Sequence, residues 1–220
     1  MKRSRGSSMN SMSHPVEVSR ERTRLLCLCG FLSPAVAFAA IGLAIALSPW
    51  FSWRKNALSD LGALNSPVWP IFNTGLVLSG LLALVFARVL LEKARARGRL
   101  ATTGAFLLWL GSLSLGLIGI LPEDVGFAHF LVSLLFFVLT PLGLLALGSS
   151  RLLPKREGGP REGLYRGLVV LVLGLLALAT WILWGLSRPE LGISVPEIIA
   201  AVFISAAMIL LALDVLKGHF

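Results

Sequence analysis

Six long apolar stretches alternate with short polar segments along this chain of 220 residues. Each stretch holds roughly the 20 residues that an α-helix needs to cross a hydrocarbon core of about 30 Å. The stretches cover residues 25–48, 69–91, 100–121, 127–147, 164–187 and 192–216. This pattern predicts an all-α polytopic membrane protein, in which a bundle of six transmembrane helices forms one domain over residues 25–217.

The positive charges are concentrated in every second polar segment. Of the 20 Lys and Arg residues, 17 lie in the N-terminal arm, in the segments after the second and fourth stretches, in the C-terminal tail, or, for Arg88 and Arg166, in the ends of the stretches that border these segments. The other three are Arg54, Lys55 and Arg188. Because positively charged segments are retained in the cytoplasm, we expect a cell-membrane protein with both termini cytoplasmic. The loops around Asp60, Glu123 and Glu190 should then face outward.

The composition agrees with a membrane protein. Hydrophobic residues make up 56% of the chain, charged residues 14%, and the mean hydropathy is +0.84, which excludes an ordinary soluble domain. The net charge of +9 does not indicate nucleic-acid binding, because membrane orientation and anionic lipid headgroups already account for basic flanks. Membrane lipids are the expected partners. A second copy of the chain or another membrane protein stays open as a further partner.

Residues 1–24 differ in composition from the rest of the chain. They are rich in Ser, Arg and Met and hold almost no aliphatic residue before Val16. Such a segment cannot bury enough apolar surface to offset the entropy of ordering it. We therefore expect a disordered, basic cytoplasmic arm.

Polar side chains that could carry chemistry gather at the outward membrane level. They come from the first outer loop, the start of the second helix, the second outer turn and the start of the fourth helix. The six residues are Ser59, Asp60, Asn73, Glu123, Asp124 and His129. A histidine beside carboxylates can hold a metal or activate a water, so His129, Asp60 and Asp124 are candidate metal ligands. The same three and Glu123 are candidate catalytic groups, and Ser59 and Asn73 are candidate binding groups.

A purely structural interpretation of these residues stays open. Asp124 can cap the fourth helix, and Asp60 can stabilise a turn through its backbone. Glu123 would then be solvated, and His129 would only form a hydrogen bond between helices.

A family resemblance is carried by short segments of the first two hairpins. They are Leu-Ser-Asp-Leu-Gly at 58–62, Pro-Glu-Asp at 122–124 and His-Phe at 129–130, with Pro70, Phe72, Asn73 and Gly75 between them. With these segments the chain resembles the domain-of-unknown-function 998 family of prokaryotic multi-spanning membrane proteins. The resemblance runs from the first helix to the last. It implies an archaeal or bacterial membrane protein of about six helices without an assigned reaction or cofactor.

Three functions are compatible with these features. The first is binding of lipid at an outward-facing polar pocket, in an accessory membrane component. The second is an enzyme that acts on a lipid headgroup, with His129 and a nearby aspartate as acid, base or metal ligand and Asn73 orienting the substrate. The third is a transporter of an uncharged solute, which needs a polar path past Ser133 and Thr140.

Proton-coupled transport is disfavoured by the helix interiors. The middle thirds of the six stretches contain no Asp, Glu, Lys, Arg or His, whereas ion-coupled carriers keep such groups near the midplane. Arg88, Glu197 and Asp214 lie near helix ends. There, snorkelling or a pair between Asp214 and Lys217 accounts for them.

Overall fold

The computed structural model describes residues 13–153, 162–187 and 192–220. All regular secondary structure in this part of the chain is helical, with six long helices. They are α1 Ser13–Ala46, α2 Trp69–Arg97, α3 Arg99–Ile120, α4 Phe127–Leu152, α5 Glu162–Ser187 and α6 Ser194–Leu216. Two short 3-10 helices lie in the connections, η1 Ser59–Gly62 and η2 Glu123–Val125. Each long helix is long and apolar enough to span a membrane, which confirms the predicted fold class.

Local sequence explains where several helices begin and end. Pro70 is the second residue of α2, and proline is tolerated in a first turn because its missing N–H has no partner there. Gly98 separates α2 from α3 with a φ of 125°, and Gly126 precedes α4 with a φ of 60°. Glycine adopts positive φ without a Cβ clash, so both positions allow a tight turn.

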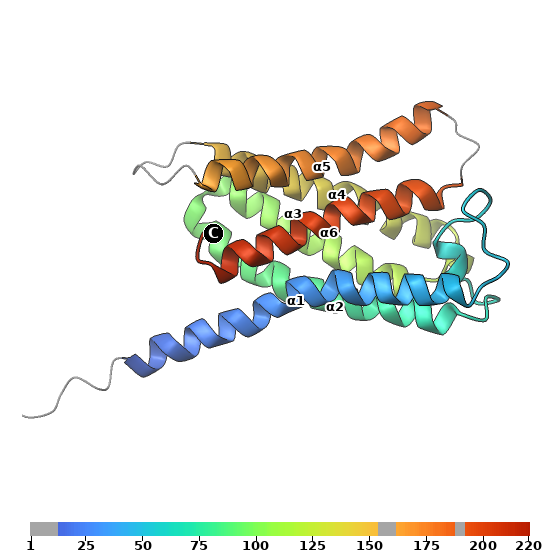
Figure 1. The fold of residues 1–220 in the computed structure, drawn as a ribbon, viewed down its shortest axis with the longest axis horizontal. Helices are drawn as coiled ribbons and strands as arrows, with labels where there is room; N and C mark the ends of the chain where they lie inside the picture. Colours follow the sequence, from blue (N-terminus) through green and yellow to red (C-terminus); the bar gives the residue numbers. More distant parts are fainter. Residues whose placement is uncertain (1–12, 154–161, 188–191) are drawn as a thin grey trace, which may run out of the picture.

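The first helix is longer than the sequence predicts. It begins at Ser13, so residues 13–24 are helical and do not belong to a disordered arm; the rest of the expected arm lies outside the described residues. Pro15 lies in the first turn, where proline is compatible with a helix, and no further proline follows it until Pro34. Figure 1 shows that the first turns of α1 project beyond the rest of the bundle.

The six helices form a ring in chain order. Each packs against the next, and α6 returns to pack against α1 (Figure 1). The α1–α6 pair makes the least extensive contact of these neighbours. The α2–α3 interface is very close, because a Cβ built on Gly80 would lie 2.5 Å from the Cα of Gly116. Close approach through small residues is how membrane helices associate without water between them.

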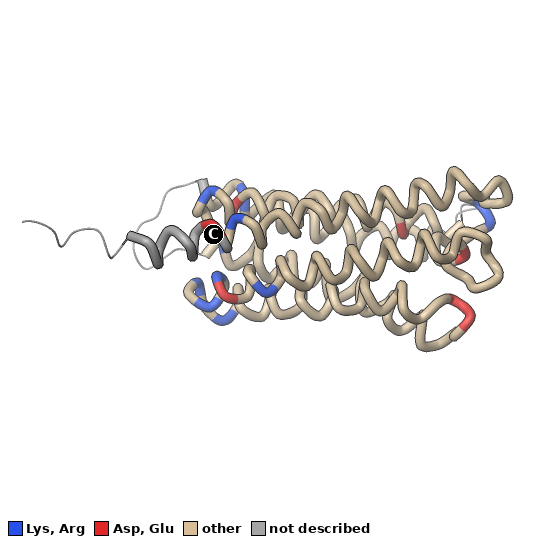
Figure 2. The backbone as a smooth tube through the Cα atoms, turned by 90° about the horizontal axis from the view of Figure 1, so that it is seen from below, with Lys and Arg blue, Asp and Glu red and all other residues tan. Residues whose placement is uncertain are grey.

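The two ends of the bundle differ in the charged residues that they carry, and most Lys and Arg residues lie at one of them (Figure 2). The loop end is formed by η1, η2 and the first turn of α6. The basic end is formed by the last turns of α2, α4 and α6 and the first turns of α3 and α5, and its cations include Arg95, Arg97, Arg151, Arg166 and Lys217.

The predicted pair between Asp214 and Lys217 is wrong. Asp214 is 1% exposed, and its two carboxylate oxygens accept hydrogen bonds from Arg151 and Arg166. Lys217 follows the last residue of α6 and is exposed. Asp214 therefore faces the bundle interior, where partners from α4 and α5 reach it.

Candidate ligand-binding site

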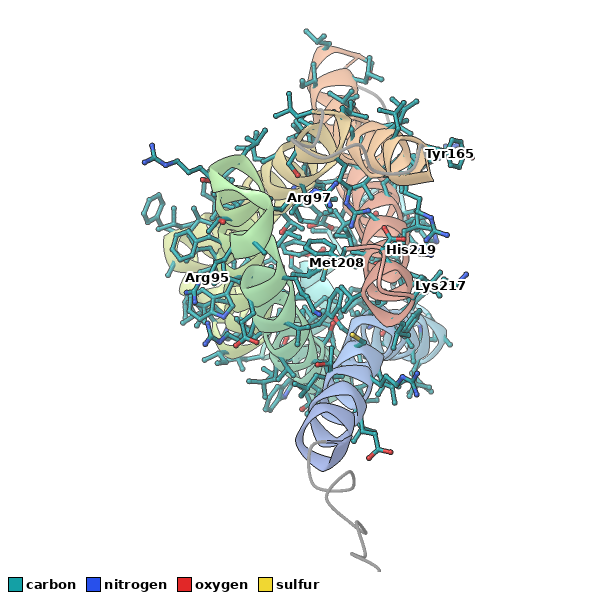
Figure 3. All side chains as sticks on the ribbon, turned by 90° about the vertical axis from the view of Figure 1, so that its left-hand side faces the viewer. Arg95, Arg97, Tyr165, Met208, Lys217 and His219 are labelled. Atoms are coloured by element: carbon teal, nitrogen blue, oxygen red, sulfur yellow. The ribbon has the colours of Figure 1, made fainter. Side chains whose placement is uncertain are left out.

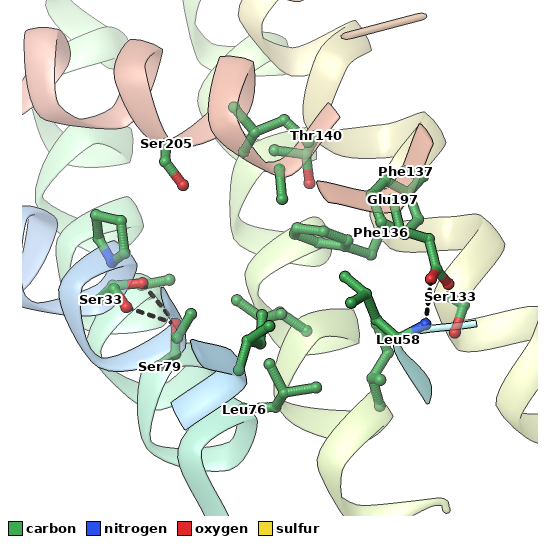
Figure 4. Close-up of a pocket in the computed structure, with 18 of the residues that line it drawn as sticks. Ser33, Leu58, Leu76, Ser79, Ser133, Phe136, Phe137, Thr140, Glu197 and Ser205 are labelled. Carbon is green, nitrogen blue, oxygen red and sulfur yellow. Dashed lines mark hydrogen bonds between the residues drawn. The ribbon is translucent and has the colours of Figure 1, made fainter. Parts of the chain in front are cut away.

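A cavity of about 100 Å³ lies inside the ring of helices. Side chains from α1, α2, α3, α4, α6 and η1 line it, and most of them are apolar. The larger ones are Phe38, Ile41, Leu76, Phe136, Phe137 and Met208. Figure 4 shows these helices around the open space. The site is thus an apolar chamber within the membrane-spanning part of the protein.

A few polar groups interrupt the apolar wall. Ser33 and Ser79 satisfy each other, with their hydroxyl oxygens 3.0 Å apart and Ser79 donating to the Ser33 carbonyl at 2.8 Å. Thr140 is 4% exposed, and its buried Oγ1 has no hydrogen-bond partner. The oxygens of Thr140 and Ser205 point toward the open space in Figure 4. Thr140 Oγ1 is thus an unpaired polar atom in the wall, packed against Gly111.

Glu197 brings a carboxyl group to the same cavity from the first turns of α6. Its Oε2 accepts a hydrogen bond from the Leu58 backbone N–H at 2.7 Å. Glu197 lies on one stripe of α6 with Ala201, Ser205 and Met208, all of which line the cavity. Sequence reasoning placed Glu197 only by its nearness to a helix end. The spacing of four, four and three residues is the pattern that would have found this inward stripe.

The short helix η1 forms the wall between this cavity and a second cleft at the loop end of the bundle, the outer cleft. Leu58 and Ser59 line the inner cavity, whereas Asp60 and Ala63 line the cleft. The cleft is acidic, because Glu123 and Asp124 also line it and the described residues around it include no Lys or Arg. The loop segment from Leu58 to Ala63 thus separates the apolar cavity from the acidic cleft.

Two of the predicted site residues hold this loop in place. The Asn73 side chain donates from Nδ2 to the Gly62 carbonyl at 2.9 Å. The Asp124 carboxylate accepts from the Leu64 backbone N–H at 2.7 Å, and it does not cap α4. Both contacts satisfy backbone groups of a segment that has no regular ladder of hydrogen bonds.

Asp60 stabilises its own turn, as the structural interpretation expects. Its Oδ2 accepts from Asn56 Nδ2 at 2.6 Å and from the Ala57 backbone N–H at 3.2 Å. One oxygen of Asp60 is therefore used within the loop.

His129 is separated from the aspartates. Its Nδ1 donates to the Leu121 carbonyl at 2.6 Å, which leaves Nε2 of the neutral ring as an acceptor. His129 lines the inner cavity, whereas Asp60 and Asp124 line the outer cleft. The structure does not bring these three candidate metal ligands together. Among the described residues there is no group of three or more His, Cys, Asp or Glu side chains that could hold a metal.

Glu123 is the most perturbed acid of the outer cleft. Burial, together with a hydrogen bond to the Asp60 carboxyl and the charge of that carboxyl, raises the pKa of Glu123 to about 7. The charge of Asp124 acts in the same direction, and a hydrogen bond to Ser59 opposes it. Its Oε2 is buried and accepts no hydrogen bond. Glu123 and Asp60 thus form a carboxyl pair that holds a proton near neutral pH.

A closed ring of six membrane-spanning helices with an internal cavity defines a multi-pass membrane protein. The family model described as "Protein of unknown function (DUF998)" matches residues 31–214, from α1 to α6, so the chain belongs to this family. No curated protein and no solved structure matches the chain.

Proposed function

We propose that this protein binds a membrane lipid, with a hydrocarbon segment in the inner cavity and the polar head at the loop end. The observation that carries the proposal is the cavity itself. Protein interiors are close-packed, and an empty cavity of this size costs on the order of 2 kcal/mol. An occupant of matching chemistry removes that cost.

Hydrocarbon fits the cavity better than water does. A buried water needs two to four polar partners, and cavities with apolar walls stay dry. Here Ser33 and Ser79 already bond to each other, and most of the wall surface exposed to the cavity is apolar. A slim alkyl or isoprenoid segment makes dispersion contacts with the aromatic and aliphatic side chains.

The polar groups at the loop end favour a head that donates hydrogen bonds. Glu197 and the Nε2 of His129 are acceptors at the cavity, and Asp60, Glu123 and Asp124 line the cleft beyond η1. A hydroxyl or amine would pair with these acceptors, whereas a phosphate or carboxylate would be repelled by them.

The contact between α1 and α6 supplies a route from the bilayer. It is the least extensive contact in the ring. Both helices line the cavity near it with small side chains, namely Pro34 and Ala37 from α1 and Ala201 and Ser205 from α6. A chain moving sideways between them would never leave an apolar environment.

A pair of substitutions on α6 tests lipid binding. Ala201→Phe places a large side chain in the cavity, whereas Val202→Phe adds the same ring at a position 49% exposed on the outside of the bundle. In native mass spectrometry of detergent-purified protein, the wild type and Val202→Phe should keep one lipid-sized adduct, and Ala201→Phe should lose it. Ser205→Leu gives a second filling variant with the same expected loss. Equal adducts in all four proteins would refute the proposal.

A second candidate function, acid–base chemistry on a lipid headgroup, is favoured by the carboxyl pair in the cleft. A carboxyl group with a pKa of about 7 is suited to general acid or base catalysis at neutral pH. In this case Glu123→Gln should abolish conversion of an added lipid to product, followed by mass spectrometry, while the lipid adduct remains. Conversion at the wild-type rate would exclude Glu123 as the acid or base.

For orientation we propose that the basic end faces the cytoplasm of the cell and the loop end faces outward, in line with the positive-inside rule. Exposed positions at the two ends allow a direct test. In a protein with Cys27 and Cys29 replaced by Ala, a membrane-impermeant maleimide applied to intact cells should label Asn65→Cys and leave His219→Cys unlabelled. The reverse pattern would overturn the orientation.

A further inference from the structure

At the basic end, arginines from different helices gather around one carboxylate. Arg151 of α4 and Arg166 of α5 donate to the two oxygens of Asp214 on α6. The side chains of Arg151 and Asp214 are each 2% exposed. Arg97, the last residue of α2, lies within electrostatic range of both.

Several guanidinium groups in this cluster lack acceptors. Arg151 Nε, Arg151 Nη2 and Arg97 Nε are buried and have no hydrogen-bond partner. Leaving a buried donor unpaired costs about 1–3 kcal/mol, and more when the group is charged. Such groups are rare in native proteins, and they often mark the place of an ion or water.

The cluster also carries more positive than negative charge. Three guanidinium groups face a single carboxylate, and both oxygens of that carboxylate are already used. The ring of Phe220 lies 4.8 Å from the central guanidinium carbon of Arg151 and covers one face of it. What the cluster lacks is a compact anion with several oxygens, which arginine binds in a planar, two-pronged geometry.

We propose that the basic end holds a phosphate-binding site, in which Arg97 and the unpaired edge of Arg151 bind the phosphate oxygens. Figure 3 shows Arg97 directed toward the interior of the bundle, whereas Arg95 on the same turn points to the outside. The phosphate belongs either to the headgroup of a phospholipid or to free inorganic phosphate, since both present the same oxygens. The site lies at the opposite end from the loop end and does not depend on lipid binding in the cavity.

Arg97→Gln is the test variant, and Arg95→Gln is its matched control. Both remove one positive charge from the same turn, but Arg95 is exposed. Thermal unfolding is measured in dodecyl maltoside, which contains no phosphate. One series adds inorganic phosphate against sodium chloride of equal ionic strength, and the other adds phosphatidylglycerol against a neutral galactolipid.

The wild type and Arg95→Gln should melt several degrees higher with at least one phosphate source. Arg97→Gln should need about tenfold more of it for the same rise, as expected for the loss of one charge-assisted hydrogen bond. A response to inorganic phosphate identifies the free anion, and a response to phosphatidylglycerol alone identifies the headgroup.

The variants also separate binding from a structural role. Without any phosphate, Arg97→Gln should melt no lower than the wild type, because its Nε has no acceptor to lose. A lower melting temperature in that state would show that Arg97 serves the fold, and it would overturn the proposal. Equal responses of all three proteins, or no response to either source, would overturn it as well.

Discussion

The carboxyl pair in the outer cleft predicts an unusual pH dependence of stability. Glu123 has a pKa of about 7 in the folded protein and an ordinary value of 4.5 in the absence of its neighbours. Between these values the folded protein binds a proton that the unfolded chain has released. Stability must therefore fall as the pH rises from about 4.5 to about 7, which is opposite to the usual effect of an ion-paired carboxylate.

The size of the effect follows from the raised pKa and the exposure of the group. Glu123 is only partly buried, so solvent screens part of its interaction with Asp60. After this allowance the loss between pH 4.5 and pH 8 is about 1–2 kcal/mol. For a protein of this size such a loss lowers the melting temperature by a few degrees.

Thermal unfolding in detergent at pH 5, 6, 7 and 8 measures this loss. Glu123→Gln keeps the shape of the protonated acid but cannot ionise, so its stability should decline less than that of the wild type over this range. Glu92→Gln, which removes an exposed carboxylate far from the cleft, should follow the wild type. Identical slopes for Glu123→Gln and the wild type would refute the assignment of the proton to Glu123.

Two further predictions concern helix packing and the buried ion cluster. Gly80→Ala should destabilise the protein by about 1–3 kcal/mol, because the new Cβ would meet the backbone of Gly116. The matched Gly42→Ala, with no atom within 4 Å, should be neutral or slightly stabilising in thermal unfolding, and an equal loss in both would refute the close packing. Asp214→Asn should cost about 3–5 kcal/mol because it leaves buried guanidinium groups unpaired, whereas Glu92→Gln in an exposed pair should cost less than about 1 kcal/mol. Similar melting temperatures for these two variants would contradict the burial of the cluster.

The helices and the family could be predicted from the sequence because length and apolar composition decide both. The start of α2 at Trp69 and the end of α5 at Ser187 agree with the predicted stretches. The predicted family is confirmed over residues 31–214. The helical extension of α1 to Ser13 was missed because composition reports whether a segment can be buried, and a helix can continue beyond the buried part.

The rotation of each helix about its axis was much harder to predict. In a membrane protein both the lipid-facing and the inward faces are apolar, so hydropathy does not distinguish them. Glu197 and Asp214 were therefore placed along their helices but not on the inward face. Small residues at matching spacing, as at Ala201 and Ser205, carry the missing information.

The paths of the short loops could not be predicted from the sequence either. Asp60 lines the cleft and His129 lines the cavity, because η1 passes between the two and separates them. That arrangement depends on single contacts, such as the one between Asp124 and the Leu64 backbone. Loops of this kind have no periodic pattern from which their course can be inferred.

The cavity is the centre of the proposed function, and an experimental structure of the purified protein tests it most directly. The resolution must be sufficient to distinguish an alkyl chain from ordered water. Lipid binding predicts continuous, elongated density that enters between α1 and α6, passes Thr140 or Ser205 and ends beside Glu197. A collapsed cavity, or separate water peaks bonded to the serine and threonine hydroxyls, would contradict it.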